Sequence, residues 1–341
     1  YDHWLGANLL EFVSDAYDLR LYDNDGAEHR LPGYRVDAQT DAAIRYITEP
    51  RDRPFFLTCS FLEPHHQNHR DDYPAPTGYR EAFRDFPLPP DLRHLPGHHP
   101  PHVPGGTAAR DWAGYCGMVK RLDEALGRIE DALRSTGQLD DTVIVFFADH
   151  GCHFKTRNGE YKRAIHDASA RIPLVFAGPG FRGGGRREPM ASLLDIPPTL
   201  LELAGGAAPE DMDGRSLLPL LRPDSPADWP DDVFIQTSEY EIGRAIRTPR
   251  WKYGVVAPDA DPCQAPPTDV VYRETYLYDM DSDPDETCNL VDQETHAALM
   301  DRLRERLLRR MAEAGEPAPE IRPAPRKRHS QRKVEDHEID A

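Results

Sequence analysis

Apolar positions along the chain follow two spacings that alternate with one another. Three- and four-residue steps predict amphipathic helices over residues 36–47, 118–133 and 198–204. Short continuous apolar runs predict strands over 54–62, 142–148 and 172–177. The run at 142–148 is of the kind found in a strand covered on both faces. Strands that alternate with helices are typical of an α/β fold with a mainly parallel sheet flanked by helices.

The pattern changes after residue 226. Short β-like pieces separated by proline-rich loops follow at 233–237, 244–246, 251–255 and 275–278, and a helical spacing covers 294–311. We therefore predict three parts: an α/β domain over 1–226, a small C-terminal α+β unit with an antiparallel sheet over 227–312, and a tail over 313–341. The tail is rich in proline and charge, which predicts disorder.

Composition narrows the classes of function. The 341 residues include 41 Lys and Arg against 59 Asp and Glu, a formal net charge of −18. A nucleic-acid-binding protein would show a basic surface instead, so no nucleic-acid partner is expected. The 5 cysteines are scattered and contain no C-x-x-C pair, which predicts neither a zinc site nor a disulfide framework.

The ends of the chain and its apolar runs bear on membranes and processing. No apolar run approaches the ~18 residues that span a bilayer, so no membrane span is predicted. The first residues have neither the basic start nor the apolar stretch of a signal peptide. The sequence begins with Tyr1 rather than Met, which is typical of a processed or truncated chain.

Asp149 and His150 are the sharpest chemical signal. They follow directly on the apolar run at 142–148. Ligands of open parallel sheets gather beyond the carboxyl ends of the strands, so this pair is well placed to bind a cation. Carboxylate oxygen with imidazole nitrogen suits Ca²⁺, Mg²⁺ or Mn²⁺. The alternative is that Asp149 caps the next turn and His150 is only packed.

Two further places carry candidate groups. Lys162 comes shortly after the Asp-His pair and could hold an anionic substrate, although most lysines are solvated surface residues. His65, His66 and His69 follow the predicted strand at 54–62, within a proline- and histidine-rich loop over 63–106. Imidazoles suit a general acid, a substrate contact or a metal ligand, but histidine clusters in loops are often incidental.

Taken together, these segments resemble the sulfatase family of the alkaline phosphatase superfamily. The resemblance extends over residues 30–310, and it rests on the order of several motifs along the chain. The matching segments are 54–65, 143–151, 161–174, 192–205 with 213–217, 244–253 and 277–290.

The resemblance implies roles for individual residues. Asp149 and His150 would be two ligands of the active-site cation, with Ca²⁺ favoured over Mn²⁺ or Mg²⁺. Lys162 would contact the sulfate group. His65, which follows Pro64, would be the leaving-group acid or a sulfate contact, with His66 and His69 as further substrate contacts. The substrate would be a small-molecule or sugar sulfate ester.

One part of the family pattern is missing. Members carry an aspartate pair on the first strand and a C-x-P-S-R or C-x-A-x-R motif, whose cysteine becomes the formylglycine nucleophile. None of the five cysteines of this chain stands in such a motif. In the family these parts lie upstream, so we expect the chain to be an N-terminal truncation that contains no nucleophile and does not turn over substrate as it stands.

The leading hypothesis is therefore a sulfuric ester hydrolase in its complete form. A phosphonate monoester or phosphodiester hydrolase of the same superfamily would share the Asp-His pair and the lysine. A non-catalytic metal- or anion-binding protein is the alternative from another class.

Overall fold

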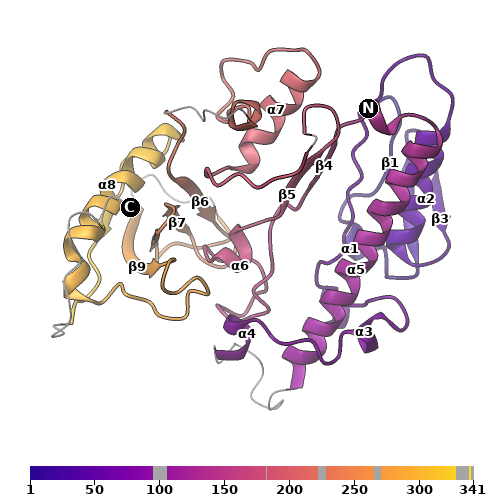
Figure 1. Ribbon diagram of the computed structural model, residues 1–341. Helices are drawn as coiled ribbons and strands as arrows, with labels where there is room; N and C mark the ends of the chain where they lie inside the picture. Colours follow the sequence, from indigo (N-terminus) through magenta and orange to yellow (C-terminus); the bar gives the residue numbers. More distant parts are fainter. Residues whose placement is uncertain (95–105, 182, 222–227, 265–269, 328–337, 339–341) are drawn as a thin grey trace. The chain divides into compact units, whose positions relative to one another are not determined.

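The computed structural model describes residues 1–94, 106–181, 183–221, 228–264, 270–327 and 338 (Figure 1). These residues fall into two compact units, each of which is described by itself. The first unit contains residues 1–92, 106–145 and 176–181. The second contains the remaining described residues, including the whole C-terminal part of the chain.

The first unit opens with a small antiparallel sheet that sequence patterns did not predict. It consists of β1 (Leu5–Gly6), β2 (Leu19–Asp23) and β3 (Glu28–Leu31), in the order β1-β2-β3. The turn between β2 and β3 is closed by the Asp23 carboxylate, whose Oδ1 accepts from the backbone N–H groups of Asp25 and Ala27 at 3.0 and 2.9 Å. The strands are too short, and β3 too polar, to give an alternating signal.

Two helices form the centre of the first unit. α2 (Arg35–Thr48) packs against α5 (Gly106–Ser135), and both confirm helices predicted from apolar spacing. Val36 packs with Leu122 and Ala125 near one end of α2, and Ile47 packs with Leu133 near the other. Short helices α1 (Leu10–Val13), α3 (Tyr79–Ala82) and α4 (Pro90–His94) lie in the connecting segments.

The predicted strand at 54–62 is wrong, because no strand is found in that segment. Phe55 and Leu57 pack onto the cluster of Ile47 and Leu133, whereas the side chain of Phe56 between them is 67% exposed. The apolar run thus covers one hydrophobic cluster with alternate side chains and joins no sheet.

The next two strands confirm the predicted positions but not the predicted burial. β4 (Ile144–Phe147) and β5 (Leu174–Ala177) form a two-stranded sheet. Phe146 and Phe147 are 36% and 46% exposed, so β4 is not covered on both faces within the described residues. α6 (Asp167–Ala170) precedes β5, and α7 (Ile196–Leu203) confirms the helix predicted at 198–204. Ser192 and Asp195 form a capping box just ahead of α7.

The C-terminal part of the second unit contains the predicted antiparallel sheet. Its strands are β6 (Val233–Thr237), β7 (Gly243–Arg247), β8 (Trp251–Val256), β9 (Val271–Asp279) and β10 (Glu320–Arg322), in the order β10-β9-β8-β7-β6. All neighbours pair antiparallel except β10, which runs parallel to β9. β10 lies within the tail that was predicted to be disordered.

α8 (Ala297–Glu313) closes this sheet and confirms the C-terminal helix. Leu299, Leu303 and Leu307 recur at four-residue steps and are buried with Ile246 and Tyr253 of the sheet in one hydrophobic core.

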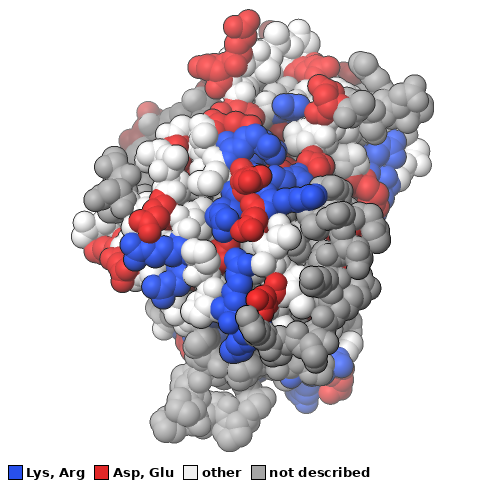
Figure 2. All heavy atoms as spheres, turned by 90° about the vertical axis from the view of Figure 1, so that its left-hand side faces the viewer, with Lys and Arg blue, Asp and Glu red and all other residues white. Residues whose placement is uncertain are grey.

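Arg304, Arg306 and Arg310 of α8 pair with carboxylates. Arg306 and Arg310 both bind Asp232, at 2.8 and 2.6 Å. Figure 2 accordingly shows Lys and Arg side chains interleaved with Asp and Glu on this face. None of the helices in the described ranges is both long and apolar enough to cross a membrane.

Candidate active site

The Asp-His pair lies directly beyond the end of β4, as predicted. The Asp149 side chain is 85% exposed, and that of His150 is 28% exposed. Oδ1 of Asp149 accepts from the backbone N–H of His150 at 3.0 Å, and the other carboxylate oxygen is 3.7 Å from Nε2 of His150. An oxygen and a nitrogen of the kinds that bind hard cations are therefore close together.

The tautomer of His150 follows from its contact with the backbone. Nδ1 lies 2.8 Å from the carbonyl oxygen of Gly151, and a carbonyl only accepts. Nδ1 therefore carries the proton, and Nε2 has the lone pair in the neutral ring. Metal-binding histidines are commonly oriented by such a bond from the second ring nitrogen. The donor set thus fits a divalent cation, although no group of three metal-binding side chains occurs among the described residues.

Gly151 allows the loop after β4 to lie against α6. Its N–H donates to the carbonyl of Ser169 at 2.7 Å. A Cβ at this position would be 2.2 Å from the carbonyl oxygen of Ala168, closer than any real contact. The position therefore requires glycine, because the backbone of α6 lies so close, and the sequence alone could not show this contact.

Lys162 lies on an irregular segment, residues 157–167, which we call the Lys162 segment and which is hydrogen-bonded to the same loop. The N–H of His153 donates to the carbonyl of Tyr161 at 2.7 Å, while Gly151 binds the chain beyond Lys162. Nζ of Lys162 is 5.5 Å from the centroid of the Tyr161 ring, and the side chain is half-buried. The second unit thus brings the Asp149–His150 loop and the Lys162 segment together through the backbone.

The three predicted histidines belong to the first unit. Nδ1 of His65 lies 2.6 Å from the carbonyl oxygen of His66 and 3.3 Å from Oε2 of Glu11. Because the carbonyl only accepts, Nδ1 carries a proton. The ring of His66 is buried against Tyr73, and its Nε2 is 3.0 Å from Asp71.

His69 differs from the other two in its exposure. Its side chain is 54% exposed, and its Nδ1 accepts from Nε2 of Gln67 at 3.1 Å. The three rings thus have separate surroundings. Their roles in binding substrate stay predictions.

A buried ion pair holds the segment that carries His65, and sequence reasoning did not find it. Arg35 at the start of α2 donates through Nε to Oε1 of Glu63 at 2.9 Å, and both side chains are fully buried. Arg35 also donates to the side-chain oxygen of Gln67 at 3.3 Å. One guanidinium group therefore fixes both sides of His65. Arg35 is one of many charged residues in the sequence, so no pattern signalled this pair.

Comparisons with known proteins show which family the chain belongs to. The family model described as sulfatase matches residues 1–207, and the model described as N-sulphoglucosamine sulphohydrolase, C-terminal, matches residues 159–313. The multifunctional alkaline phosphatase superfamily protein PehA of Trinickia caryophylli is 28% identical in a match that covers 88% of this chain. The choline-sulfatase of Rhizobium meliloti (strain 1021) is 31% identical, again with 88% of this chain covered.

Solved structures give the same fold. The structure of BT4656 in complex with its substrate D-glucosamine-2-N,6-O-disulfate has a TM-score of 0.70 at 22% identity, and the match covers 92% of this chain and 76% of that one. The phosphonate monoester hydrolase of Agrobacterium radiobacter has a TM-score of 0.58 at 28% identity and covers 83% of this chain and 62% of its own.

The fold is therefore that of the alkaline phosphatase superfamily, with mixed α/β content and a C-terminal sheet that contains antiparallel strands. Within that superfamily, the chain belongs to the sulfatase family of hydrolases. The chain spans 65% of the length of PehA and 66% of that of the choline-sulfatase.

Proposed function

We propose that the complete protein containing this chain hydrolyses sulfuric esters with a divalent cation, Ca²⁺ being favoured, and a formylglycine nucleophile that these 341 residues do not supply. The observation that carries the proposal is the backbone connection between the Asp149–His150 loop and the Lys162 segment. This connection brings the loop of Asp149 and His150 close to the segment of Lys162, which supports their assignment as cation ligands and anion contact. The substrate class is a small-molecule or sugar sulfate ester.

Each residue has a role that its surroundings support. Asp149 and His150 would hold the cation, the histidine through Nε2 because Nδ1 binds the Gly151 carbonyl. A cation there acts as a Lewis acid that neutralises charge on the ester oxygens. Lys162 would stabilise the same oxygens electrostatically.

His65 would give a proton to the departing alcohol oxygen. Since Nδ1 is directed at the His66 carbonyl, the transferred proton would come from Nε2 of the imidazolium form, which leaves the neutral ring protonated at Nδ1.

The test is hydrolysis by the complete gene product, produced together with a formylglycine-generating enzyme. We expect turnover of 4-nitrophenyl sulfate, and a loss of about 100- to 1,000-fold in kcat/KM for Lys162→Ala, the size seen when one group that stabilises an oxyanion is removed. Lys120→Ala is the matched control, because Lys120 is an exposed lysine of α5 that pairs with Asp123. Equal activity of the two variants would contradict the role of Lys162.

The second candidate function is hydrolysis of phosphonate monoesters. It is favoured by the 28% identity to the phosphonate monoester hydrolase of Agrobacterium radiobacter. A ratio of kcat/KM above one for 4-nitrophenyl phenylphosphonate over 4-nitrophenyl sulfate would select it. Binding of Ca²⁺ without hydrolysis of either ester would select the non-catalytic alternative.

A further inference from the structure

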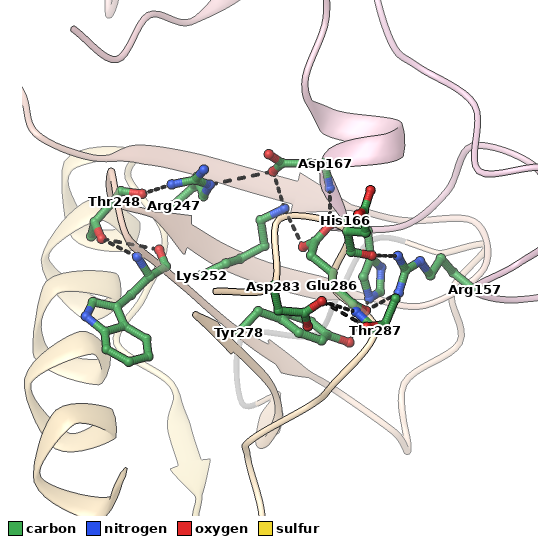
Figure 3. Close-up of polar contacts among 12 residues, drawn as sticks. Arg157, His166, Asp167, Arg247, Thr248, Lys252, Tyr278, Asp283, Glu286 and Thr287 are labelled. Carbon is green, nitrogen blue, oxygen red and sulfur yellow. Dashed lines mark hydrogen bonds and ion pairs between the residues drawn. The ribbon is translucent and has the colours of Figure 1, made fainter. Parts of the chain in front are cut away.

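A buried cluster of charged side chains connects the Lys162 segment, residues 157–167, to the C-terminal sheet (Figure 3). Nζ of Lys252, on β8, is 2.5 Å from Asp167 and 2.7 Å from Oε1 of Glu286. The side chains of Lys252 and Glu286 are 0% and 1% exposed, and that of Asp167 is 14% exposed. Arg247 of β7 lies 3.6 Å from the same carboxylate of Asp167.

The loop that carries Glu286 holds both ends of the Lys162 segment. At one end, the guanidinium group of Arg157 donates to the backbone carbonyls of Glu286 and Asp285 at 2.6 and 2.7 Å. At the other end, the backbone N–H of Asp167 donates to Oε2 of Glu286 at 2.6 Å. Lys162 lies midway between these two attachments. The segment between them forms no helix or strand except the first residue of α6.

The holding loop, residues 283–288, is closed by hydrogen bonds within itself. Asp283 accepts from the backbone N–H groups of Thr287 and Cys288 at 3.0 and 2.8 Å. Glu286 has a φ of +53°, a left-handed conformation that a non-glycine residue adopts only where its surroundings impose it. The loop is thus built to present the Glu286 carboxylate and two carbonyls in fixed directions.

Burial makes this cluster costly as a source of stability alone. Burial raises the pKa of Glu286, against the attraction of Lys252. Burial also acts to raise the pKa of Asp167, but Lys252 and Arg247 bring it below its usual value. A well-packed apolar group would often stabilise a fold as much as a buried ion pair does. What the charges add is direction, since Lys252 lies between the two carboxylates and so fixes Asp167 of the Lys162 segment relative to Glu286.

We propose that Glu286 and Lys252 are positioning residues that hold the Lys162 segment so that the ammonium group of Lys162 meets the anionic group of the substrate. This rests on the proposed function, because it takes Lys162 as the anion contact. Its basis is that the C-terminal sheet, through the 283–288 loop, fixes both ends of a segment with no regular structure. A displacement of about 1 Å in such a group can lower a rate by about 100-fold.

The experiment compares Glu286→Gln with Glu316→Gln in the complete protein. Glu316 pairs with Arg244 of β7 at 2.7 Å and is half-buried. Its substitution is therefore a matched loss of one carboxylate that is bound to the same sheet. For Glu286→Gln we expect faster backbone hydrogen exchange within residues 157–167 and a kcat/KM about 10- to 100-fold lower. For Glu316→Gln we expect both to stay at wild-type values.

A double-mutant cycle with Lys162→Ala separates positioning from stability. If Glu286 acts through Lys162, Glu286→Gln has little further effect on kcat/KM once Lys162 is alanine. Equal effects in both backgrounds would overturn the proposal, as would unchanged exchange in residues 157–167. Arg157→Met, which removes the other attachment, should reproduce the result, and it serves if Glu286→Gln does not fold.

Inorganic sulfate distinguishes failure of this proposal from failure of the proposed function. If the wild-type protein hydrolyses neither ester, the proposed function fails, but calorimetric binding of sulfate still tests the positioning. The positioning proposal would be supported if Glu286→Gln weakened sulfate binding in the otherwise wild-type protein but had no further effect on sulfate binding when Lys162 is alanine. No sulfate binding by the wild-type protein would overturn it.

Discussion

Replacement of Gly151 by alanine should disturb the candidate site through the backbone alone. The added Cβ would lie 2.2 Å from the carbonyl oxygen of Ala168 and 3.1 Å from its carbonyl carbon. Both contacts are to backbone atoms, so no side chain can turn away. The two segments must separate by about 1 Å, and overpacking of this kind costs about 1–3 kcal/mol. The bond from Gly151 to Ser169, at 2.7 Å, would weaken as well, which adds about 1 kcal/mol.

Urea unfolding of the purified protein measures this cost, and calorimetric titration with Ca²⁺ measures its consequence for the Asp149–His150 loop. We expect a lower unfolding midpoint and weaker Ca²⁺ binding for Gly151→Ala. The matched control is Gly127→Ala, because Gly127 is exposed on α5 and has no heavy atom within 4 Å of an added Cβ. There alanine should stabilise by about 1 kcal/mol through helix propensity. Wild-type stability of Gly151→Ala would refute the close approach on which the reasoning depends.

Three further predictions concern the core, a thiol and a carboxylate. Leu307 is fully buried in the C-terminal core, so Leu307→Ala should lower the free energy of unfolding by about 2–5 kcal/mol in urea titrations; a change within the range of surface substitutions would contradict that core. Burial raises the pKa of Cys116 to about 11, so only about 0.1% of this thiol is thiolate at pH 8. Peptide mapping should therefore show slower alkylation by iodoacetamide at Cys116 than at the exposed Cys263, and equal rates would argue against burial of Cys116. Burial acts to raise the pKa of Asp167, but Lys252 and Arg247 outweigh it, so the pKa of Asp167 is lower in the folded state than in the unfolded state. The stabilisation that Asp167 contributes is therefore present above pH 3.8 and is lost as the pH falls further. The stability difference between wild type and Asp167→Asn should therefore be constant from pH 6 to about 4 and shrink as the pH falls below 3.8, and a difference that stays constant below pH 3.8 would refute the assignment.

Sequence patterns predicted the elements whose burial follows a regular period. α2, α5 and α8 each bury a stripe of apolar residues, and β6 to β9 bury alternate or continuous positions against α8. The segment at 54–62 looked like a strand because its apolar residues are consecutive, but only its alternate side chains find a hydrophobic cluster. β1 and β3 escaped prediction because β1 has only two residues and β3 is polar, and β2 was missed because it buries only Leu19 and Leu21, too few to mark a period.

The same limit applies to the candidate site. The order of motifs predicted that Asp149 and Lys162 belong together, and the backbone bonds of the second unit agree with that. The residues that hold Lys162 in place could not be predicted in this way. Lys252 and Glu286 are far from it in the sequence, and each is an ordinary charged residue there. Only the packing of β8 and the 283–288 loop against the Lys162 segment makes them partners.

The central claim is that Asp149 and Lys162 form the cation and anion sites of an ester hydrolase. It is tested most directly by hydrolysis of 4-nitrophenyl sulfate by the complete protein and its Asp149→Asn variant, each after chelation and after addition of Ca²⁺. Asp141→Asn is the control, since Asp141 is an exposed carboxylate just before β4. We expect that chelation abolishes wild-type activity, that Ca²⁺ restores it in the wild type and the control, and that Asp149→Asn stays at least about 100-fold less active. Full activity of Asp149→Asn, or activity that survives chelation, would contradict it.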